Sequence, residues 1–424
     1  MNLGVRYDYF NGSNPAIDLP AGSLVGPRHF DSVSDVPNWH DISPRLGVAY
    51  DLFGTGKTAL KAFVGSYVLG GGPTSQNHPL NRTVTQATRT WTDSNGDFVP
   101  DCSVTDPVAN GECGPLSPTD FGLPNPRATR YDPDILAGFA KRQNNWQTLA
   151  EIAHELRPGL SVTGGYYRRW FGNLTVTDNV LVTAADHDPF CVTAPVDPRF
   201  PGGGGNSICG FYDISPGRFG QISNLITFAD HYGKQTQVYD GVDVTARLRL
   251  ANIDIAGGMN TGRTAINSCF VVDSPQQLYN CDVSPPFLTQ AKVNVVYPLP
   301  WWGLQTSAIV QSLPGPEILA SYVATNAQVR ESLGRNLSSG VNGTATVDLI
   351  KPGTTYADRI LEGSVRVSKQ VVVAGARLSL IADVYNILNG SGAVRLNTRY
   401  GPSWLVPTEL QNPRYFKFGA QLNF

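Results

Sequence analysis

The chain has 424 residues, of which 32 are basic and 34 are acidic, so its formal net charge is -2. This balance gives no reason to expect a nucleic-acid partner, because a phosphate backbone is bound by a basic protein face. Charged residues make up 16% of the chain, below the roughly 25% of soluble domains. The 44 glycines and 31 prolines favour strands, turns and long loops over helices.

The start of the chain reads as a strand. Met1 to Arg6 lack the basic-then-apolar pattern of a secretory signal peptide. No apolar run in the sequence reaches the roughly 18 residues of a membrane helix. We therefore expect either a cytoplasmic protein or a fragment whose targeting segment lies upstream.

The cysteines favour the second of these. They fall as three close pairs, each inside a stretch rich in Pro, Gly, Asp and Asn: Cys102 with Cys113, Cys191 with Cys209, and Cys269 with Cys281. None has the C-x-x-C spacing of a zinc or thioredoxin-like centre, and disulfides persist in oxidising compartments. The spacing predicts one disulfide in each of three loops; six free thiols, or another connectivity, are the alternatives.

Alternation of apolar and polar residues predicts strands along most of the chain. In 242–250, for example, valines, alanine and leucines alternate with Asp243, Thr245, Arg247 and Arg249. The segment 144–156 also fits a helical face, but the adjoining turn at 157–159 favours a strand. We predict twelve strands, near 3–10, 44–53, 58–69, 144–156, 160–176, 235–250, 252–264, 287–297, 303–312, 358–369, 375–388 and 414–424.

The connections between these strands alternate strictly between short and long. Short turns follow every second strand, the last at 370–374, and the intervening connections run over 11–43, 70–143, 177–234, 265–286, 313–357 and 389–413. All three cysteine pairs fall in the long set. Short inner turns and long outer loops are typical of an all-β, antiparallel transmembrane β-barrel. Its lumen would then be lined by polar strand faces that include Arg247, Arg249, Glu362 and Arg366.

The end of the chain resembles the assembly signal of bacterial outer-membrane proteins. In the sequence KFGAQLNF, the positions that match are Lys417, Gly419, Leu422 and the terminal Phe424. The resemblance implies that the last strand is recognised by the barrel-assembly machinery.

Three further stretches resemble TonB-dependent receptors, and the Oar-like transporters among them: DISPRLGVAYD at 41–51, YRRWFGNLTVT at 167–177 and ADVYNILN at 382–389. The resemblance implies an outer-membrane transporter of a Gram-negative bacterium that takes up a scarce external ligand, without an enzymatic reaction or a required cofactor. Its partners would be outer-membrane lipid and the TonB energy-coupling complex, which acts through a plug domain. Residues 1–424 would form one partial barrel domain, the second half of a 22-stranded barrel, with plug and signal peptide absent.

One long connection contains oxygen ligands spaced as in a calcium loop. Asp93, Asn95, Asp97, the carbonyl of Val99, and Asp101 occupy positions 1, 3, 5, 7 and 9. Val104 stands where an EF-hand has its bidentate glutamate, so a solvated Asp/Asn turn is the alternative.

No residue set is assigned a catalytic role. The alternative function is a secreted, disulfide-stapled all-β module that binds calcium or glycans, and an extracellular glycan hydrolase is a third hypothesis.

Overall fold

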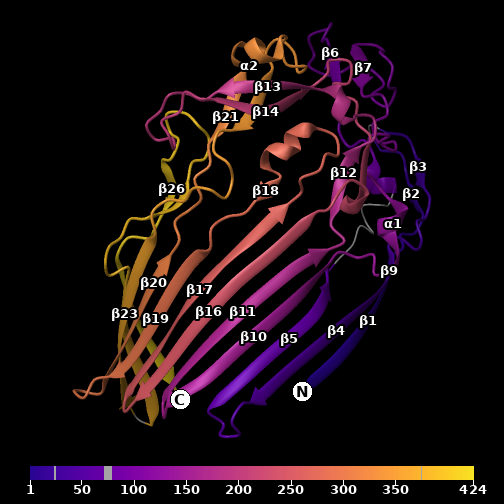
Figure 1. Cartoon of the computed structure of the whole chain (residues 1–424). Coiled ribbons are helices and arrows are strands. Elements are labelled where there is room, and N and C mark those ends of the chain that lie inside the picture. Colours follow the sequence, from indigo (N-terminus) through magenta and orange to yellow (C-terminus); the bar gives the residue numbers. More distant parts are fainter. Residues whose placement is uncertain (23–24, 71–78, 374) are drawn as a thin grey trace.

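A computed structural model describes residues 1–22, 25–70, 79–373 and 375–424, and within them one long antiparallel sheet dominates the fold (Figure 1). In sheet order, its twelve main strands are β1 (Asn2–Asn11), β4 (Asn38–Asp51), β5 (Thr58–Val68), β10 (Asn144–Arg157), β11 (Leu160–Gly172), β16 (Thr236–Leu250), β17 (Ile253–Asn267), β19 (Leu288–Pro298), β20 (Leu304–Leu313), β23 (Ile360–Val373), β24 (Ala376–Tyr385) and β27 (Tyr415–Asn423). Two short strands, β9 (Ala137–Phe139) and β18 (Asp282–Val283), extend it at β4 and β17. The predicted antiparallel fold and the strand nature of 144–156 are confirmed.

Several boundaries differ from the prediction; the strand expected at 160–176, for example, ends at Gly172. β4 begins at Asn38 and not near residue 44. The reason is that all ten residues of β1 pair with β4, from Asn2 with Gly47 to Asn11 with Asn38. β23 continues to Val373 through the stretch predicted as a turn from residue 370. Three consecutive valines have high strand propensity, and Val371 and Val372 pair with Leu378 and Arg377 of β24.

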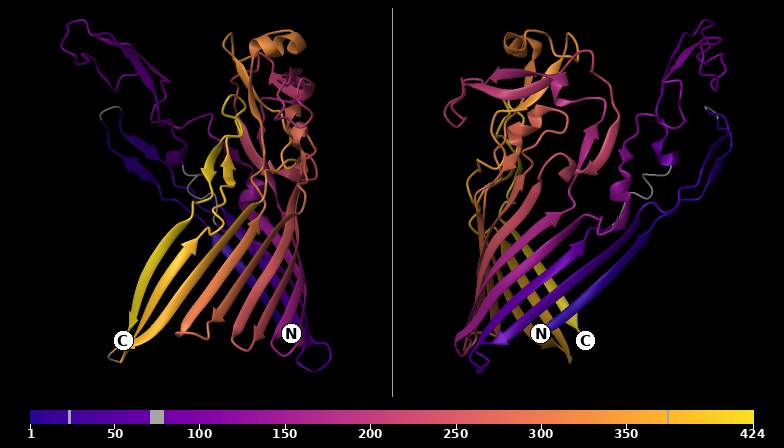
Figure 2. Two further views of the ribbon diagram at one scale, coloured as in Figure 1. Left: turned by 90° about the vertical axis from the view of Figure 1, so that its left-hand side faces the viewer. Right: turned by 45° about the vertical axis from the view of Figure 1, so that its right-hand side comes forward.

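The strands give the sheet two chemically different faces. On the outer face, Val242 and Val244 of β16 lie beside apolar or small residues of β11 and β17, such as Gly164 and Met259. On the inner face lie the alternate residues of each strand, which are mostly polar. In Figure 1 and in the right view of Figure 2 the C-terminal strands curve away behind the middle ones, so the sheet has the form of a barrel wall.

The two edge strands of this wall, β1 and β27, do not pair with each other. β1 pairs with β4 and β27 pairs with β24, and among the described residues no ladder joins β1 to β27. Each edge strand therefore presents one row of backbone N–H and C=O groups without a strand partner.

The short turns lie at one end of the sheet and the long connections at the other (Figure 2). Within the described ranges, the long connections contain β2 (Ile17–Leu19), β3 (Arg28–Phe30), η2 (Pro79–Arg82), β6 (Thr88–Trp91), β7 (Cys113–Ser117), β8 (Arg130–Tyr131), α1 (Pro133–Leu136), β12 (Thr175–Asn179), η3 (Ala184–Asp186), β13 (His187–Thr193), β14 (Ser207–Ile214), β15 (Asn224–Phe228), η4 (Ala229–His231), η5 (Pro275–Asn280), β21 (Ser321–Thr325), α2 (Asn326–Leu333), β22 (Thr344–Asp348), β25 (Ala393–Leu396) and β26 (Pro407–Leu410). In this part of the chain, no helix has both the length and the apolar character needed to cross a membrane.

Several long connections pack together into a cap above the sheet (Figure 1). One apolar cluster joins Phe190 and Phe211 of the β13–β14 hairpin to Val329 of α2 and Val347 of β22. A second joins Phe200 and Trp404 to residues of the 313–357 connection. Burial of such side chains stabilises a fold by roughly 1.5–3 kcal/mol each. The cap is therefore a packed unit with cores of its own, not a set of independent loops.

Candidate functional site: the inner face and the external cap

The predicted lumen-lining residues lie on the inner face and are paired there. The guanidinium groups of Arg247 and Arg249 both contact the carboxylate of Asp254, at 3.0 and 3.1 Å. Arg366 donates two hydrogen bonds to Asp383, at 2.6 and 3.0 Å. Glu362 accepts a hydrogen bond from the side-chain amide of Gln311 at 2.8 Å. Strand register puts all four residues on one face, and their role in lining a lumen stays a prediction.

A polar hollow of about 810 Å³ lies on this inner face, across the strands from β11 to β20. Its wall includes acidic, basic and amide side chains: Asp243, Arg247, Asn260, Gln290, Lys292, Asn294 and Gln311. Such a mixture can hydrogen-bond a polar solute or another polar protein surface.

Arg366 offers a direct stability test of the inner-face ion pairs. Asp383 is buried, and Arg366→Gln would leave its carboxylate without its main partner. We expect Arg366→Gln to lower the free energy of unfolding by about 1–3 kcal/mol, measured by urea titration in detergent or vesicles. The control, Arg395→Gln, breaks an exposed 3.6 Å pair with Glu409 and should cost less than about 1 kcal/mol. Equal effects of the two substitutions would contradict this account.

Within the external cap, ion pairs join different long connections to each other. Arg335, which follows α2, contacts Asp188 of β13 at 2.7 Å and Asp213 of β14 at 2.5 Å. Burial lowers the pKa of the Arg335 guanidinium, but the hydrogen bonds to Asp188 and Asp213 and the charges of these two carboxylates together outweigh burial, so the pKa is raised. One arginine therefore holds the 177–234 connection to the 313–357 connection.

A further contact ties the 389–413 connection into the cap. Arg199 donates to the Asp197 carboxylate at 2.6 Å and to the Trp404 carbonyl at 2.9 Å, and its guanidinium lies 5.1 Å from the Trp404 ring centre. Tyr400 also donates a hydrogen bond to Asp197. The hydrogen bonds from Arg199, first from its side chain and then from its backbone, lower the pKa of Asp197 to about 2.

This pKa predicts how the cap responds to acid. A carboxyl whose pKa is lower in the folded protein stabilises it above the unfolded pKa, and that contribution is lost as the pH falls through the folded pKa. We expect the near-UV circular dichroism of the cap to be unchanged at pH 4 and to change as the pH approaches 2. Asp197→Asn should remove this change, whereas Asp230→Asn, at an exposed position elsewhere, should retain it. A transition near pH 4 in the unsubstituted protein would contradict the assignment.

The three predicted disulfides are present: Cys102–Cys113, Cys191–Cys209 and Cys269–Cys281. Each closes a single long connection. The second crosses the β13–β14 hairpin beside the first apolar cluster of the cap.

The proposed calcium loop is held by its own hydrogen bonds. The Asp93 carboxylate accepts from the backbone N–H groups of Gly96 and Phe98, at 2.8 and 3.1 Å. The amide of Asn95 donates to Asp97 and to Asp101, at 3.1 and 2.9 Å. Across the described ranges, no three His, Cys, Asp or Glu side chains are grouped to hold a metal ion. Calcium binding, with the Val99 carbonyl as a further ligand, stays a prediction that a calcium titration of the purified protein can decide.

Glu112 was not singled out from the sequence, yet it organises this loop. Its carboxylate accepts from the backbone N–H groups of Ser94, at 2.7 Å, and Asp101, at 3.2 Å, and from the Trp91 indole at 3.2 Å. The bond from Ser94 is the main cause of the lowered pKa of Glu112. The Glu112 carboxylate, one residue before Cys113, therefore joins the beginning of the loop at Ser94 to its end at Asp101.

The helix α2 was also not predicted, although the sequence contains its signals. Thr325 and Gln328 form a capping box at its start, and Gly334 ends it in the left-handed conformation, with φ of 78°. Arg335 comes next in the chain. A search for Thr-x-x-Gln followed by Gly would have indicated the helix, but not the acidic partners of Arg335.

The C-terminal signal residues lie on the edge strand. In β27, Phe416, Phe418 and Leu422 are exposed on the outer face, while Lys417 pairs in register with Asp383 on the inner face. Gly419 lies on the same side as Lys417, and Phe424 follows the strand. Recognition of this strand by the assembly machinery stays a prediction.

Comparison with known proteins gives structural similarities without a sequence family. No family model and no curated protein matches the chain. It is similar to the FrpB iron transporter from Neisseria meningitidis, with 10% identity and a TM-score of 0.43 over 99% of this chain and 42% of that one. It is similar to the siderophore receptor PiuA from Acinetobacter baumannii, with 10% identity and a TM-score of 0.45 over 100% of this chain and 40% of that one. The ferripyoverdine receptor of the Pseudomonas aeruginosa outer membrane gives 10% identity and a TM-score of 0.42, over 99% and 36%. The chain spans less than half the length of each of these proteins.

Proposed function

We propose that this chain is part of an outer-membrane barrel that takes up an external ligand, as a TonB-dependent receptor of a Gram-negative bacterium. The observation that carries the proposal is the difference between the two faces of the sheet. The outer face exposes apolar side chains that would be costly in water, and the inner face carries paired charges and a polar hollow.

The free edges support a larger assembly. In a bilayer, unpaired backbone groups at β1 and β27 would each cost several kcal/mol, so a stable barrel needs further strands between these edges. We propose that additional strands of a longer chain close the wall, making 1–424 the second half of a 22-stranded barrel. An associated plug would receive energy from the TonB complex, and the Oar-like subtype rests on the sequence resemblance alone.

The cap supports a receptor role at the end with the long connections. It is rigidified by disulfides, by Arg335 and by two apolar clusters, so it can present a fixed surface to an external ligand. In the proposed uptake, the ligand meets the cap first and then the polar inner face. No cofactor or bond-breaking step is needed for such transport.

The test is fractionation of the source cells followed by gels of boiled and unboiled outer-membrane extract. A band in that fraction whose mobility changes on heating is the expected result for a folded barrel. A soluble secreted protein without a heat-dependent shift would overturn the transporter and favour the disulfide-stapled binding module.

A further inference from the structure

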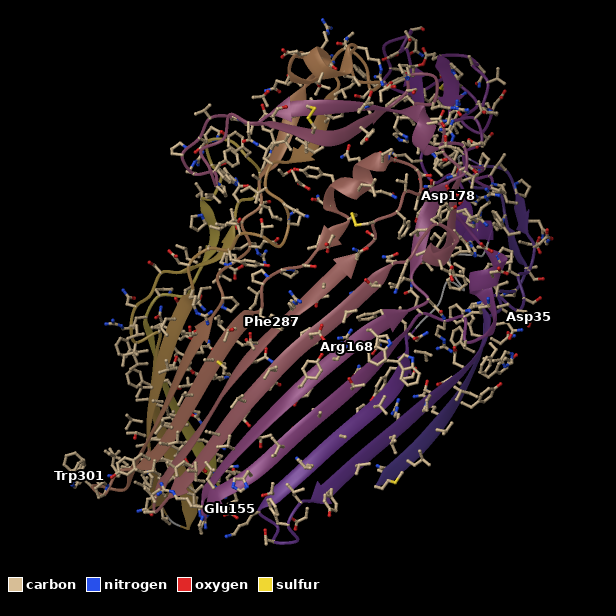
Figure 3. The ribbon with its side chains drawn as sticks, in the orientation of Figure 1. Asp35, Glu155, Arg168, Asp178, Phe287 and Trp301 are labelled. Atoms are coloured by element: carbon tan, nitrogen blue, oxygen red, sulfur yellow. A yellow bond between two sulfur atoms is a disulfide. The ribbon has the colours of Figure 1, made fainter. Side chains whose placement is uncertain are left out.

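A second pocket, smaller than the polar hollow, lies where the external connections meet the cap end of β4. It has a volume of about 280 Å³, and its wall comes from β4, the end of β5, β8, α1, β12, β15 and the segment between β9 and β10. In Figure 1, α1, β9 and β12 lie together on this side of the molecule. Figure 3 labels Asp178 of β12 and Asp35, shortly before β4, and both lie at the cap end of the sheet. We call this cavity the β4 pocket.

Part of the wall of the β4 pocket is apolar and aromatic. Trp39, Ile135 and Phe228 line it, and each is buried. The indole N–H of Trp39 donates to the Ile135 carbonyl at 2.8 Å, which fixes the ring. Leu69 also lines the pocket and its side chain is exposed, so the pocket is open on that side. A solute that enters would therefore bury a flat apolar body against two aromatic rings.

The charged side chains of the wall are both cations, Lys141 and Arg142. The Lys141 ammonium lies 5.5 Å from the Phe228 ring centre, and the Arg142 guanidinium lies 5.2 Å from the ring centre of Trp39. The side-chain amide of Asn173 donates to the Arg142 carbonyl at 2.9 Å. Both cations are therefore held beside the aromatic part of the wall.

Arg142 has hydrogen-bond donors that the protein does not use. Its side chain is 9% exposed, and its Nη2 lies 2.9 Å from Oδ2 of the buried Asp41. That contact lacks the direction of a hydrogen bond: in the described part of the chain, Nε and Nη2 of Arg142 and Oδ2 of Asp41 are buried without a hydrogen-bond partner. Buried donors normally have acceptors. Lys141, Arg142 and Asp41 together carry one positive charge, so a single added anion would balance them.

The unused donors have the geometry of a carboxylate site. Nε and the Nη2 on the same side of a guanidinium can bind both oxygens of one carboxylate. Arg366 shows this arrangement in the same protein, with its Nε and Nη2 on the two oxygens of Asp383 at 2.6 and 3.0 Å. In Arg142 the same two nitrogen atoms have no such partner among the described residues. The acceptor that fits them is the carboxylate of a bound molecule.

We propose that the β4 pocket binds a small aromatic carboxylate of the size of benzoate. The carboxylate would accept hydrogen bonds from Arg142 and Lys141, and the ring would lie against Trp39 and Phe228. A volume of about 280 Å³ is close to the lower limit of roughly 300 Å³ for ligand pockets, so the ligand is a compact one. This inference goes beyond the proposed function, because it adds a ligand class and depends on the fold of the external connections and not on transport.

The experiment is a calorimetric titration of the protein as its source cells make it, in nonionic detergent if it is extracted from a membrane, with benzoate as the probe. We expect saturable binding. Benzamide has the ring without the charge, and acetate has the charge without the ring, so each should bind roughly tenfold more weakly or worse. Benzamide or inorganic phosphate binding as tightly as benzoate would overturn the proposal, because the charge or the ring would then contribute nothing.

Substitutions locate the bound acid in the pocket. Lys141→Gln should weaken benzoate binding roughly tenfold, and Arg142→Gln should weaken it more, since each removes a charge-assisted hydrogen bond. Arg142→Gln also leaves Asp41 buried without its cation, so Lys141→Gln is the deciding variant. The control is Arg127→Gln, at an exposed position of the same 70–143 connection, which should leave binding unchanged. Full benzoate binding by Lys141→Gln with an unaltered circular dichroism spectrum would overturn the assignment.

Ligand binding and membrane location are read separately. An outer-membrane protein that shifts on heating but binds no benzoate at millimolar concentration would overturn this inference alone. A soluble protein that binds benzoate with the expected preferences would overturn the proposed function and leave this inference intact.

Discussion

Val244→Arg is expected to destabilise the chain in a bilayer by about 2–4 kcal/mol, the cost of an arginine at the midplane of a barrel's lipid face. Val244 lies in the middle of the outer apolar band of β16, beside Gly164 and Met259, and its side chain is exposed. A charge there has no protein partner and would have to be buried in hydrocarbon. The measurement is urea unfolding in lipid vesicles, followed by the heat-dependent shift on gels.

The matched control is the next residue in the chain. Thr245 is also exposed, but it lies on the inner face at the polar hollow. Thr245→Arg should therefore change stability by less than about 1 kcal/mol, because water and polar groups can solvate the new charge. If Val244→Arg were as mild as Thr245→Arg, the outer face would be in contact with water and the membrane assignment would be wrong.

The sheet could be predicted from the sequence because its signals are local. Alternation with a period of two places Val242 and Arg247 on opposite faces, and short turns join neighbouring strands that pair with each other. Boundaries failed where local signals misled: the polar start of β4 resembled a loop, and the valines of β23 continued past an expected turn. The disulfide pairing could also be predicted, because each disulfide joins two cysteines of the same connection.

The cap could not be predicted because its contacts are distant in sequence. Phe190 meets Val347, and Arg199 meets Trp404 across more than two hundred residues. Neither the alternation of apolar and polar residues nor the turn residues indicate which long connections pack against each other. The sequence therefore predicted long loops, without their short strands and helices and without their shared apolar clusters.

Trp404→Ala is the second substitution with a large expected effect, and it concerns the cap. Trp404 is 1% exposed, donates its indole N–H to the Leu319 carbonyl at 2.8 Å, and packs against Phe200 with ring centres 4.6 Å apart. Truncation of a buried tryptophan costs about 3–5 kcal/mol, from lost burial and the cavity left behind. We expect the connection at 194–206 to become sensitive to protease added to intact cells.

The expected loss should stay within the cap, because every residue of the second apolar cluster lies outside the twelve main strands. The heat-dependent gel shift should therefore persist in Trp404→Ala, as it should in the control Trp302→Ala, whose exposed side chain lies in the short turn between β19 and β20. Protease resistance equal to that of the unsubstituted protein would mean that the clusters do not hold the cap. If Trp404→Ala loses both the protease resistance of the cap and the heat-dependent gel shift, the sheet depends on the cap for its own stability. The substitution removes no strand pairing of the main sheet, so it could affect these strands only through the cap.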